Sequence, residues 1–347
     1  MPALRSQTIY HALAYARAAS APDTIVLSTP AEPYVCTGYH RSPAEEIDLN
    51  YCAAEGLPVV RRETGGGTVY IDDQQLFVQW IFDPARLPRK VESRFRLFCQ
   101  PLIETYQFFG INAVFFPPND VHVRNRKIVG TGAGAIGNAE VVTGNFLFDF
   151  DPGRMTALLR LPSERFRQLT RDGMEKYMSS FRQALKSPPE PETVKNVYRE
   201  KCAAVLNAVL EPGAFTAAEI ECMEQLDAQF ASEAWLAEAP AGNGPLRRVK
   251  IHANVWVTTV AIPGTGGAEI EIVLRTKGNR IDAIAISGET GLLPSHRVGS
   301  LEKALSFVAL EADPLRETLE AWFELHQVRT TRLTTEQWVD ALLKCKV

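Results

Sequence analysis

Three consecutive glycines constrain the fold of this chain more than any other feature of its sequence. Gly65, Gly66 and Gly67 follow the basic pair Arg61-Arg62 and lie between two strand-like runs. Glycine weakens a strand, so three in a row indicate that the backbone must approach something closely. Successive N–H groups in such a turn can converge on an anion. The segment therefore predicts a phosphate-binding loop, with a plain turn as the alternative.

A second segment downstream supplies charge. Asn119 and Asp120 follow two prolines, and Lys127 begins a strand-like run after a hairpin-like turn. Lysine carries a compact point charge, which suits a place where a carboxylate meets a phosphate. Taken alone, however, Lys127 is more typical of an exposed surface lysine, and Asn119-Asp120 is equally typical of a simple turn.

In sequence and order, these segments resemble the lipoate–protein ligase family. Residues 61–72 resemble its RRxSGGGxVxxD signature, with Thr64 in the serine position. Residues 119–130 resemble its NDI…RKI.G segment, with Lys127 in the place of the catalytic lysine. Similarity also extends through 34–40 and 45–60, so the resemblance covers most of the first half of the chain in the right order.

The resemblance implies an enzyme that forms an acyl-AMP from ATP and lipoate (or octanoate) and then transfers the acyl group to a lysine of an acceptor protein. It implies Lys127 as the catalytic residue and Asp120 as a candidate Mg²⁺ ligand. ATP and Mg²⁺ are thus expected as cosubstrate and metal, lipoate as substrate, and no tightly bound cofactor. The implied ATP- and lipoyl-AMP-binding residues are Arg61, Arg62, Thr64, Gly65, Gly66, Gly67, Asn119, Asp120, Lys127 and Gly130.

The chain departs from the family pattern at three places. Ile71 replaces a common histidine, and Gln74-Gln75 stands where Gly-Asn is usual. Thr143-Gly144-Asn145 replaces the usual His-Gly-Thr. We expect these changes to affect the choice of acyl chain and acceptor more than the adenylation chemistry.

The resemblance also implies the fold class. We expect an α+β protein: a biotin/lipoate ligase-like catalytic domain of mixed and antiparallel sheets with flanking helices, and a small α+β C-terminal domain. A Pro- and Gly-rich stretch places the catalytic domain at 1–240, a linker at 241–245 and the accessory domain at 246–347. Hydrophobic patterns predict strands near 25–38, 59–62, 76–82, 121–123, 127–129, 141–149, 249–262, 269–275 and 280–287, and helices at 91–109, within 155–236, and at 300–309, 314–326 and 335–344.

Residues 132–137 match the GxGxxG pattern of dinucleotide-binding folds. That fold needs a helix whose N-terminus receives the pyrophosphate. Only three residues separate Gly137 from the next strand-like run, which leaves no room for such a helix. A glycine-rich hairpin over the active site is expected instead.

Net charge, apolar runs and cysteine spacing limit the kinds of partner and the cellular compartment that we expect. The net charge of −4 gives no reason to expect a nucleic-acid partner, and no run approaches the ~18 apolar residues of a membrane span. The six cysteines are scattered without a CxxC pair, and the histidines lack metal-ligand spacing. A cytoplasmic protein with reduced thiols is therefore expected. As a separate expectation, we take the protein to be a monomer.

Two other functions remain open at this point. Related transferases on the same fold move an octanoyl or lipoyl group through a cysteine thioester without ATP. Cys36, Cys52 and Cys99 lie in no recognisable nucleophile motif, and buried cysteine is the better default for them. A non-catalytic protein that binds the lipoyl carrier is the second alternative. The acceptor is expected to be an H-protein, a dehydrogenase lipoyl domain or a specialised lipoate-binding protein.

Overall fold

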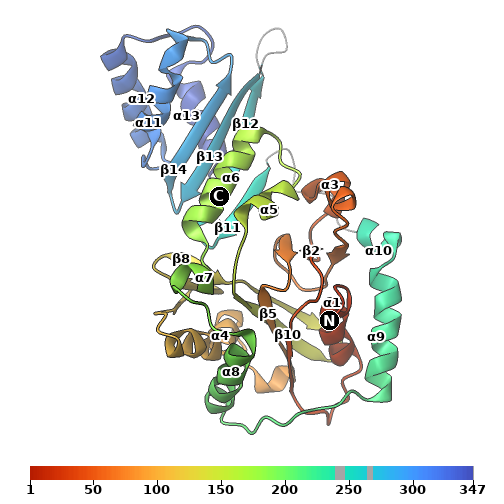
Figure 1. Ribbon diagram of the computed structural model, residues 1–347. Helices are drawn as coiled ribbons and strands as arrows, with labels where there is room; N and C mark the ends of the chain where they lie inside the picture. The colour runs from red at the N-terminus through yellow and green to blue at the C-terminus, as the bar shows by residue number, and fades with distance from the viewer. Residues whose placement is uncertain (239–246, 264–268, 347) are drawn as a thin grey trace. The chain divides into compact units, whose positions relative to one another are not determined.

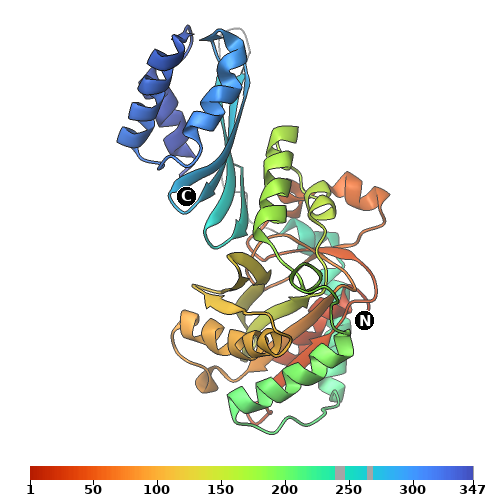
Figure 2. The same cartoon turned by 60° about the vertical axis from the view of Figure 1, so that its left-hand side comes forward.

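The chain folds into two compact units (Figures 1 and 2). The computed structural model describes residues 1–238, 247–263 and 269–346, so the predicted linker at 241–245 lies outside the described residues. Unit 1 contains residues 1–160 and 177–238, and unit 2 contains residues 161–176 and 247–346. A segment from the middle of the chain therefore belongs to unit 2, whereas the sequence-based boundary assigns it to the catalytic domain.

Within residues 1–160 and 177–238, unit 1 combines three sheets with surrounding helices. The strands are β1 (Thr24–Ser28), β2 (Tyr34–Thr37), β3 (Val59–Arg61), β4 (Val69–Ile71), β5 (Gln75–Phe82), β6 (Val114–Phe116), β7 (Asp120–Val123), β8 (Arg126–Val129), β9 (Thr131–Ile136) and β10 (Ala139–Leu147). The helices are α1 (Arg5–Tyr15), α2 (Pro43–Glu46), α3 (Leu49–Ala54), the 3₁₀ helix η1 (Pro84–Arg86), α4 (Val91–Phe108), α5 (Pro152–Ala157), α7 (Phe181–Ala184), α8 (Pro191–Leu206), α9 (Ala217–Phe230) and α10 (Glu233–Ala237).

The largest sheet of unit 1 is antiparallel, in the order β1-β5-β10-β9. Side chains alternate along β5, as a strand with two covered faces requires. Trp80 packs on one face against Phe98 of α4 and donates a hydrogen bond to Tyr198 of α8 (2.9 Å). Ile81 packs on the other face with Ile9 of α1. Apolar residues on both sides of β5 thus hold α1 on one face and α4 with α8 on the other.

Two small sheets carry the segments singled out in the sequence. In the sheet β3-β2-β4, β2 is parallel to β3 and antiparallel to β4, and the glycine loop joins β3 to β4. The sheet β6-β7-β8 is antiparallel, and the turn from β7 to β8 has positive φ at Arg124 (49°) and Asn125 (63°). Two successive positive φ angles are typical of a tight hairpin turn. The hairpin predicted there is confirmed.

The GxGxxG segment is a strand, as expected. Residues 132–136 form most of β9, the chain turns at Gly137, and β9 pairs antiparallel with β10. No helix follows the glycines, so the dinucleotide-binding interpretation fails in the structure as it did in the sequence.

Unit 2 is built around an antiparallel sheet in the order β11-β12-β13-β14. The predicted strand at 249–262 is a hairpin instead, because the chain turns at residues 253–254 between β11 and β12. Asn254 O accepts from Gly278 N (2.8 Å), at the end of the neighbouring β13. The described elements are α6 (Glu164–Tyr177), β11 (Arg248–His252), β12 (Val255–Pro263), β13 (Glu269–Lys277), β14 (Arg280–Gly288), β15 (Leu292–Leu293), the 3₁₀ helix η3 (Ser295–Arg297), α11 (Val298–Leu305), α12 (Ala312–His326), β16 (Arg329–Thr330) and α13 (Thr335–Lys344).

Helices cover both faces of the sheet in unit 2. Ile272 and Leu274 pack into the core that α11, α12 and α13 form on one face. Arg275 alternates with Leu274 and so belongs to the other face, where α6 lies. A Cβ on Gly173 of α6 would come within 2.3 Å of the Ile251 side chain, so α6 packs directly on the strands.

A buried ion pair fixes α6 to this sheet. Arg275 and Asp282 are 7% and 5% exposed, and Arg275 Nε lies 2.6 Å from Asp282 Oδ2. Arg275 also donates to the carbonyl of Leu169 in α6 (3.1 Å), and Lys176 Nζ lies 2.8 Å from Asp282 Oδ1. Breaking a buried pair leaves an uncompensated charge. These contacts, invisible in the local sequence, explain why 161–176 belongs to unit 2.

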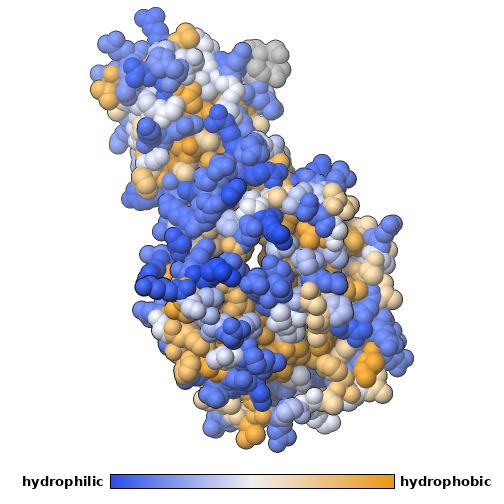
Figure 3. All heavy atoms as spheres, viewed as in Figure 1, coloured by the Kyte–Doolittle hydropathy of each residue, from blue (hydrophilic) through white to orange (hydrophobic). Residues whose placement is uncertain are grey.

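The observed architecture confirms the predicted α+β class, with helices and several antiparallel sheets. None of the helices in the described ranges has the length and apolar character needed to cross a membrane. On the face shown in Figure 3, hydrophilic side chains cover much of each unit, and apolar areas are scattered among them.

Candidate functional site

The glycine loop, residues 62–68, is shaped by the side chain of Arg62. Its Nη2 donates to Gly65 O (2.9 Å) and Gly67 O (3.0 Å), and its Nη1 donates to Cys36 O (3.3 Å). Gly66, between the two bonded carbonyls, has a φ of 107°. One guanidinium thus holds the carbonyls on one side of the loop, in the fork geometry that arginine provides.

The tip of this loop leaves backbone donors available. Gly66 and Gly67 are exposed, and neither N–H group has a hydrogen-bond partner within the residues that the structure describes. Backbone donors that the protein leaves unpaired at an exposed, glycine-rich turn suit an anion. The loop therefore has the chemistry that the sequence predicted for it.

The loop is seated on backbone without intervening side chains. A Cβ on Gly38 would lie 2.3 Å from Gly66 O, and one on Gly132 would lie 3.3 Å from Gly65 O. Gly65 N donates to Ala133 O of β9 (3.3 Å). Glycine at 38 and 132 is therefore part of the site. From the sequence, Gly132 is expected in a glycine-rich hairpin over the active site, but neither residue is predicted as a binding residue. A glycine directly after a strand was the signal for Gly38.

Helix α1 supports the start of the loop through a buried histidine. His11 Nδ1 donates to Gln7 O (2.7 Å), and Nε2 accepts from Glu63 N (3.1 Å). Burial lowers the pKa of His11 to about 3, so the ring is neutral, and its two contacts define the tautomer. Next to Glu63, Thr64 is fully buried with Oγ1 3.5 Å from the hydroxyl of Tyr10.

Arg61, the first arginine of the motif, has a different environment from Arg62. It is 1% exposed, and it donates to the carbonyls of Trp235 and Tyr39 (both 3.0 Å). Its guanidinium lies 4.1 Å from the Trp235 ring centroid, and Trp235 Nε1 donates to Arg61 O (2.9 Å). These contacts tie β3 to α10. The phosphate contact predicted for Arg61 would require these bonds to be exchanged.

Lys127 and Asp120 lie on adjacent strands and form an ion pair. Lys127 Nζ is 2.8 Å from Asp120 Oδ1, and the two side chains are 17% and 1% exposed. A carboxylate buried this deeply needs a charged or hydrogen-bonding partner. Asp120 therefore fixes the position of the Lys127 ammonium, which stays partly accessible.

Asp120 fits the predicted role of a magnesium ligand poorly. Mg²⁺ prefers an octahedral set of oxygen ligands that includes several waters. Here one carboxylate oxygen is bonded to the Lys127 ammonium, and the other lies 3.8 Å from His122 Nε2. Within unit 1, these two neighbours of the buried carboxylate are therefore nitrogen atoms, which suits an ion pair better than a magnesium site.

The remaining predicted residues lie where β8 passes into β9. Asn119 Nδ2 donates to Thr131 Oγ1 (3.0 Å), and that hydroxyl donates to Asn119 O (2.6 Å). Gly130 N donates to Asn145 Oδ1 (3.2 Å). Since the glycine loop rests on β9 and Lys127 lies in β8, a single residue, Gly130, joins the strands that carry the two parts of the site.

Together, these groups offer exposed backbone N–H donors and one oriented ammonium. Donors fixed before a reaction stabilise negative charge without reorganisation. The arrangement can therefore bind anionic groups and stabilise charge that develops between them.

The cysteines do not contribute an accessible thiol. Cys36, Cys52, Cys99, Cys202 and Cys345 are buried and Cys222 is half-buried. Burial raises the pKa of every one of these thiols above its ordinary value, in the case of Cys202 to about 11. Thiolate is the nucleophilic form, so all six are poor nucleophiles as they stand.

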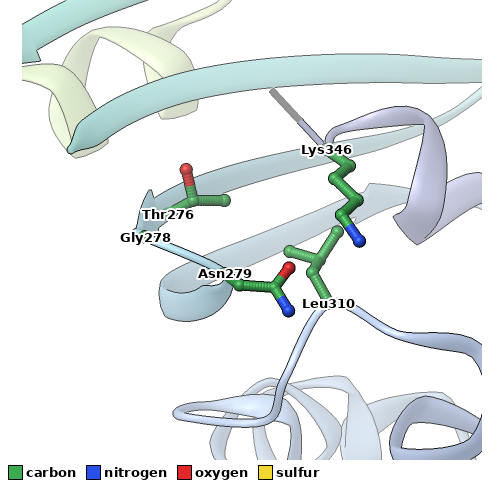
Figure 4. Close-up of a pocket in the computed structure, with 5 residues that line it drawn as sticks. All are labelled: Thr276, Gly278, Asn279, Leu310 and Lys346. Carbon is green, nitrogen blue, oxygen red and sulfur yellow. The ribbon is translucent and has the colours of Figure 1, made fainter. Parts of the chain in front are cut away.

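A separate shallow pocket lies in unit 2, far along the chain from the predicted residues. Its lining includes Thr276, Gly278, Asn279, Leu310 and Lys346 (Figure 4). None of them was predicted to have a function, and their polar side-chain groups are one hydroxyl, one carboxamide and one amine.

Comparison with known proteins assigns more than half of the chain to a family. The model of the lipoyl protein ligase A/B catalytic domain matches residues 3–203. Octanoyltransferase LipM of Kyrpidia tusciae is 28% identical over 237 residues, which are 62% of this chain and 86% of LipM. Lipoate–protein ligase 1 of Staphylococcus aureus is 26% identical over 165 residues, which are 48% of this chain and 49% of that protein.

Solved structures share the fold. A bi-partite lipoate protein ligase from Thermoplasma acidophilum is 20% identical, with a TM-score of 0.63 over 70% of this chain and 94% of its own. Lipoate-protein ligase A bound with ATP is 19% identical, with a TM-score of 0.58 over 67% and 93%. LipL1 of P. falciparum, in complex with lipoate, is 13% identical, with a TM-score of 0.53 over 99% and 96%.

Replacing Gly66 by valine should strain the loop. The φ of 107° disfavours a β-branched residue, and the new Cβ would lie 2.8 Å from Arg62 Nη2. We expect Gly66→Val to lower the free energy of unfolding by about 1–3 kcal/mol. Gly67→Val is the matched control, because a Cβ there meets nothing within 4 Å. Urea unfolding of both variants measures the difference, and equal stabilities would contradict the proposed strain.

The neutral state of His11 should make stability depend on pH. Its pKa is about 3 in the folded protein and about 6.5 when unfolded, so below pH 6.5 the unfolded state binds the extra proton. The free energy of unfolding should fall as the pH drops from 6.5 towards 3, by up to about 1.4 kcal/mol per pH unit from this residue. Urea unfolding between pH 4 and 7 should show a shallower slope for His11→Gln. His40→Gln, at an exposed site, should keep the wild-type slope.

Proposed function

The chain belongs to the lipoyl protein ligase A/B catalytic domain family, and on this premise we propose that it is an ATP-dependent lipoate–protein ligase. The observation that carries the proposal is that neighbouring segments of unit 1 carry backbone donors and an ammonium group. Unpaired N–H donors of Gly66 and Gly67 lie on a loop seated on β9, and the partly accessible ammonium of Lys127 lies on the preceding strand.

In the first step, a carboxylate oxygen of lipoate attacks the α-phosphorus of ATP. A new O–P bond forms, the bond to the β-phosphate oxygen breaks, and pyrophosphate leaves. Both reactants are anions, so they must be positioned and their charge offset. The glycine-loop N–H groups would hold phosphate oxygens, and Lys127 would donate to the oxygens at the acyl–phosphate junction. Mg²⁺ enters only as the counter-ion that ATP carries on its phosphates.

In the second step, a lysine amine of the acceptor attacks the acyl carbonyl of the mixed anhydride. The amide C–N bond forms, the C–O bond to AMP breaks, and the amine loses a proton. Lys127 would stabilise the charge that returns to the phosphate. Asp120 accepts a hydrogen bond from the Lys127 ammonium and so keeps that group aimed.

We propose a lipoyl-bearing protein as the acceptor. The Thermoplasma ligase was studied together with its E2 lipoyl domain. That pairing supports a protein of this class as acceptor here, and an H-protein or a specialised lipoate-binding protein belongs to the same chemical class.

An octanoyltransferase is the second candidate, because LipM is among the relatives. A transfer without ATP needs a thiolate that meets the acyl group. Cys99 of α4 is the thiol to consider, since the charges of Asp120 and Lys127 both act on its pKa. Burial raises that pKa, however, and Cys99 is fully enclosed in the core around Phe98 and Leu102. Its environment favours the ATP-dependent reaction.

Loss of Lys127 should abolish activation. The change also removes a charged partner of the buried Asp120 carboxylate, so circular dichroism must first show that the variant is folded at the assay temperature. We expect Lys127→Ala to reduce lipoate-dependent ATP–pyrophosphate exchange by about 10²–10³-fold, the usual effect of removing one donor to developing charge. Lys195→Ala is the matched control, because it removes a lysine from a surface pair with Glu192. A near-normal exchange rate for Lys127→Ala would sink the catalytic assignment, and exchange that needs no lipoate would sink the ligase.

No cysteine should be required for the reaction. Cys36→Ser, Cys52→Ser and Cys99→Ser should each retain ATP-dependent acyl transfer within about tenfold of wild type, apart from losses of stability at these buried positions. Cys345→Ser, in unit 2, controls for a general effect of burying a hydroxyl. Mass spectrometry of the protein incubated with octanoyl-carrier would reveal an acyl thioester. An adduct on Cys99, with transfer lost in Cys99→Ser, would establish the transferase instead.

A further inference from the structure

Two side-chain amides link the strand that leaves the glycine loop to the strand that carries Lys127. Gln75 Nε2 donates to Tyr70 O of β4 (3.0 Å). Asn145 Nδ2 donates to Gln75 Oε1 (2.8 Å), and Gly130 N donates to Asn145 Oδ1 (3.2 Å). Three consecutive hydrogen bonds therefore run from Gly130 to Tyr70. We call Gln75 and Asn145 the amide relay.

The sheet register brings the two amides together. In the pairing of β5 with β10, Gln75 is opposite Leu147 and Asn145 is opposite Phe77. Asn145 is thus two residues from the partner of Gln75, on the same face, where diagonal side chains are within reach of one another. Both positions are departures from the usual family residues, and here they are bonded to each other.

The relay has a fixed direction. Gly130 N–H can only donate, and Tyr70 O can only accept, so each amide must accept on the Gly130 side and donate on the Tyr70 side. Rotating one amide by half a turn would set oxygen against oxygen or nitrogen against nitrogen. Gln75 is 5% exposed, so water cannot readily repair such a mismatch.

Both ends of the relay are in the site. Tyr70 follows the glycine loop by two residues in β4, and Gly130 directly follows the Lys127 strand. We propose that Gln75 and Asn145 are positioning residues that fix the distance between the Lys127 strand and the phosphate-binding loop. This inference rests on the proposed function. The combined length of the two side chains, rather than either one alone, determines this spacing.

Exchanging the two amides tests the dependence on combined length. Gln75→Asn shortens the relay by one methylene and Asn145→Gln lengthens it by one, whereas the double variant restores the sum. We expect each single variant to lower the kcat of lipoate-dependent ATP–pyrophosphate exchange by roughly 10–100-fold, with KM for ATP within about threefold. The double variant should recover to within about threefold of wild type. Asn138→Gln, the same change in the turn of the β9–β10 hairpin, should have no effect.

A second readout does not depend on activity. Amide hydrogen exchange in peptides covering 126–132 should accelerate in Gln75→Asn, although Gln75 makes no bond to that segment, and should return to normal in the double variant. If wild type lacks exchange activity, the ligase proposal fails and hydrogen exchange alone decides the relay. The relay is overturned if the double variant is as impaired as the product of the singles, or if Gln75→Asn leaves the 126–132 peptides unchanged.

Discussion

The site depends on a contact between backbones that admits no side chain. The carbonyls of Gly65 and Gly66 rest against Gly132 and Gly38, and a single Cβ at Gly38 would collide with the loop. The loop lies this close to β9, and β9 directly follows the strand that carries Lys127, so neighbouring segments carry the loop N–H groups and the lysine. Arg62 then holds the loop carbonyls, and His11 holds the first residue of the loop. Both contacts act on a loop whose position depends on the close approach of Gly65 and Gly66 to Gly132 and Gly38.

The sequence predicted those parts of the site that local chemistry determines. Three glycines at a strand end indicated the loop, and alternating apolar residues indicated β5, β8 and β10. The turn at Arg124 and Asn125 followed from its polar residues. In these cases neighbouring residues decide the structure, so a single sequence contains enough information.

Other parts depend on contacts between distant residues, which no local pattern encodes. Arg61 and Arg62 are adjacent in the motif, and only the structure shows that a contact with Trp235, 174 positions away, buries Arg61. Likewise, Asn145 and Gln75 were noted separately as departures, and only the sheet register shows that one binds the other. The resemblance implied Asp120 as a metal ligand, and only the structure shows how closely Lys127 approaches it.

Helix α6 has a consequence for the construction of the molecule. The chain enters unit 2 after Arg160, returns to unit 1 after Lys176, and enters unit 2 again between residues 238 and 247. Unit 2 is therefore assembled from two separate pieces of the gene product. A cut near residue 238 would leave α6 behind without Ile251 and Arg275, the residues against which it packs. The second unit cannot be exchanged between proteins as a contiguous cassette, and any recombination that preserves it must carry the 161–176 insert as well.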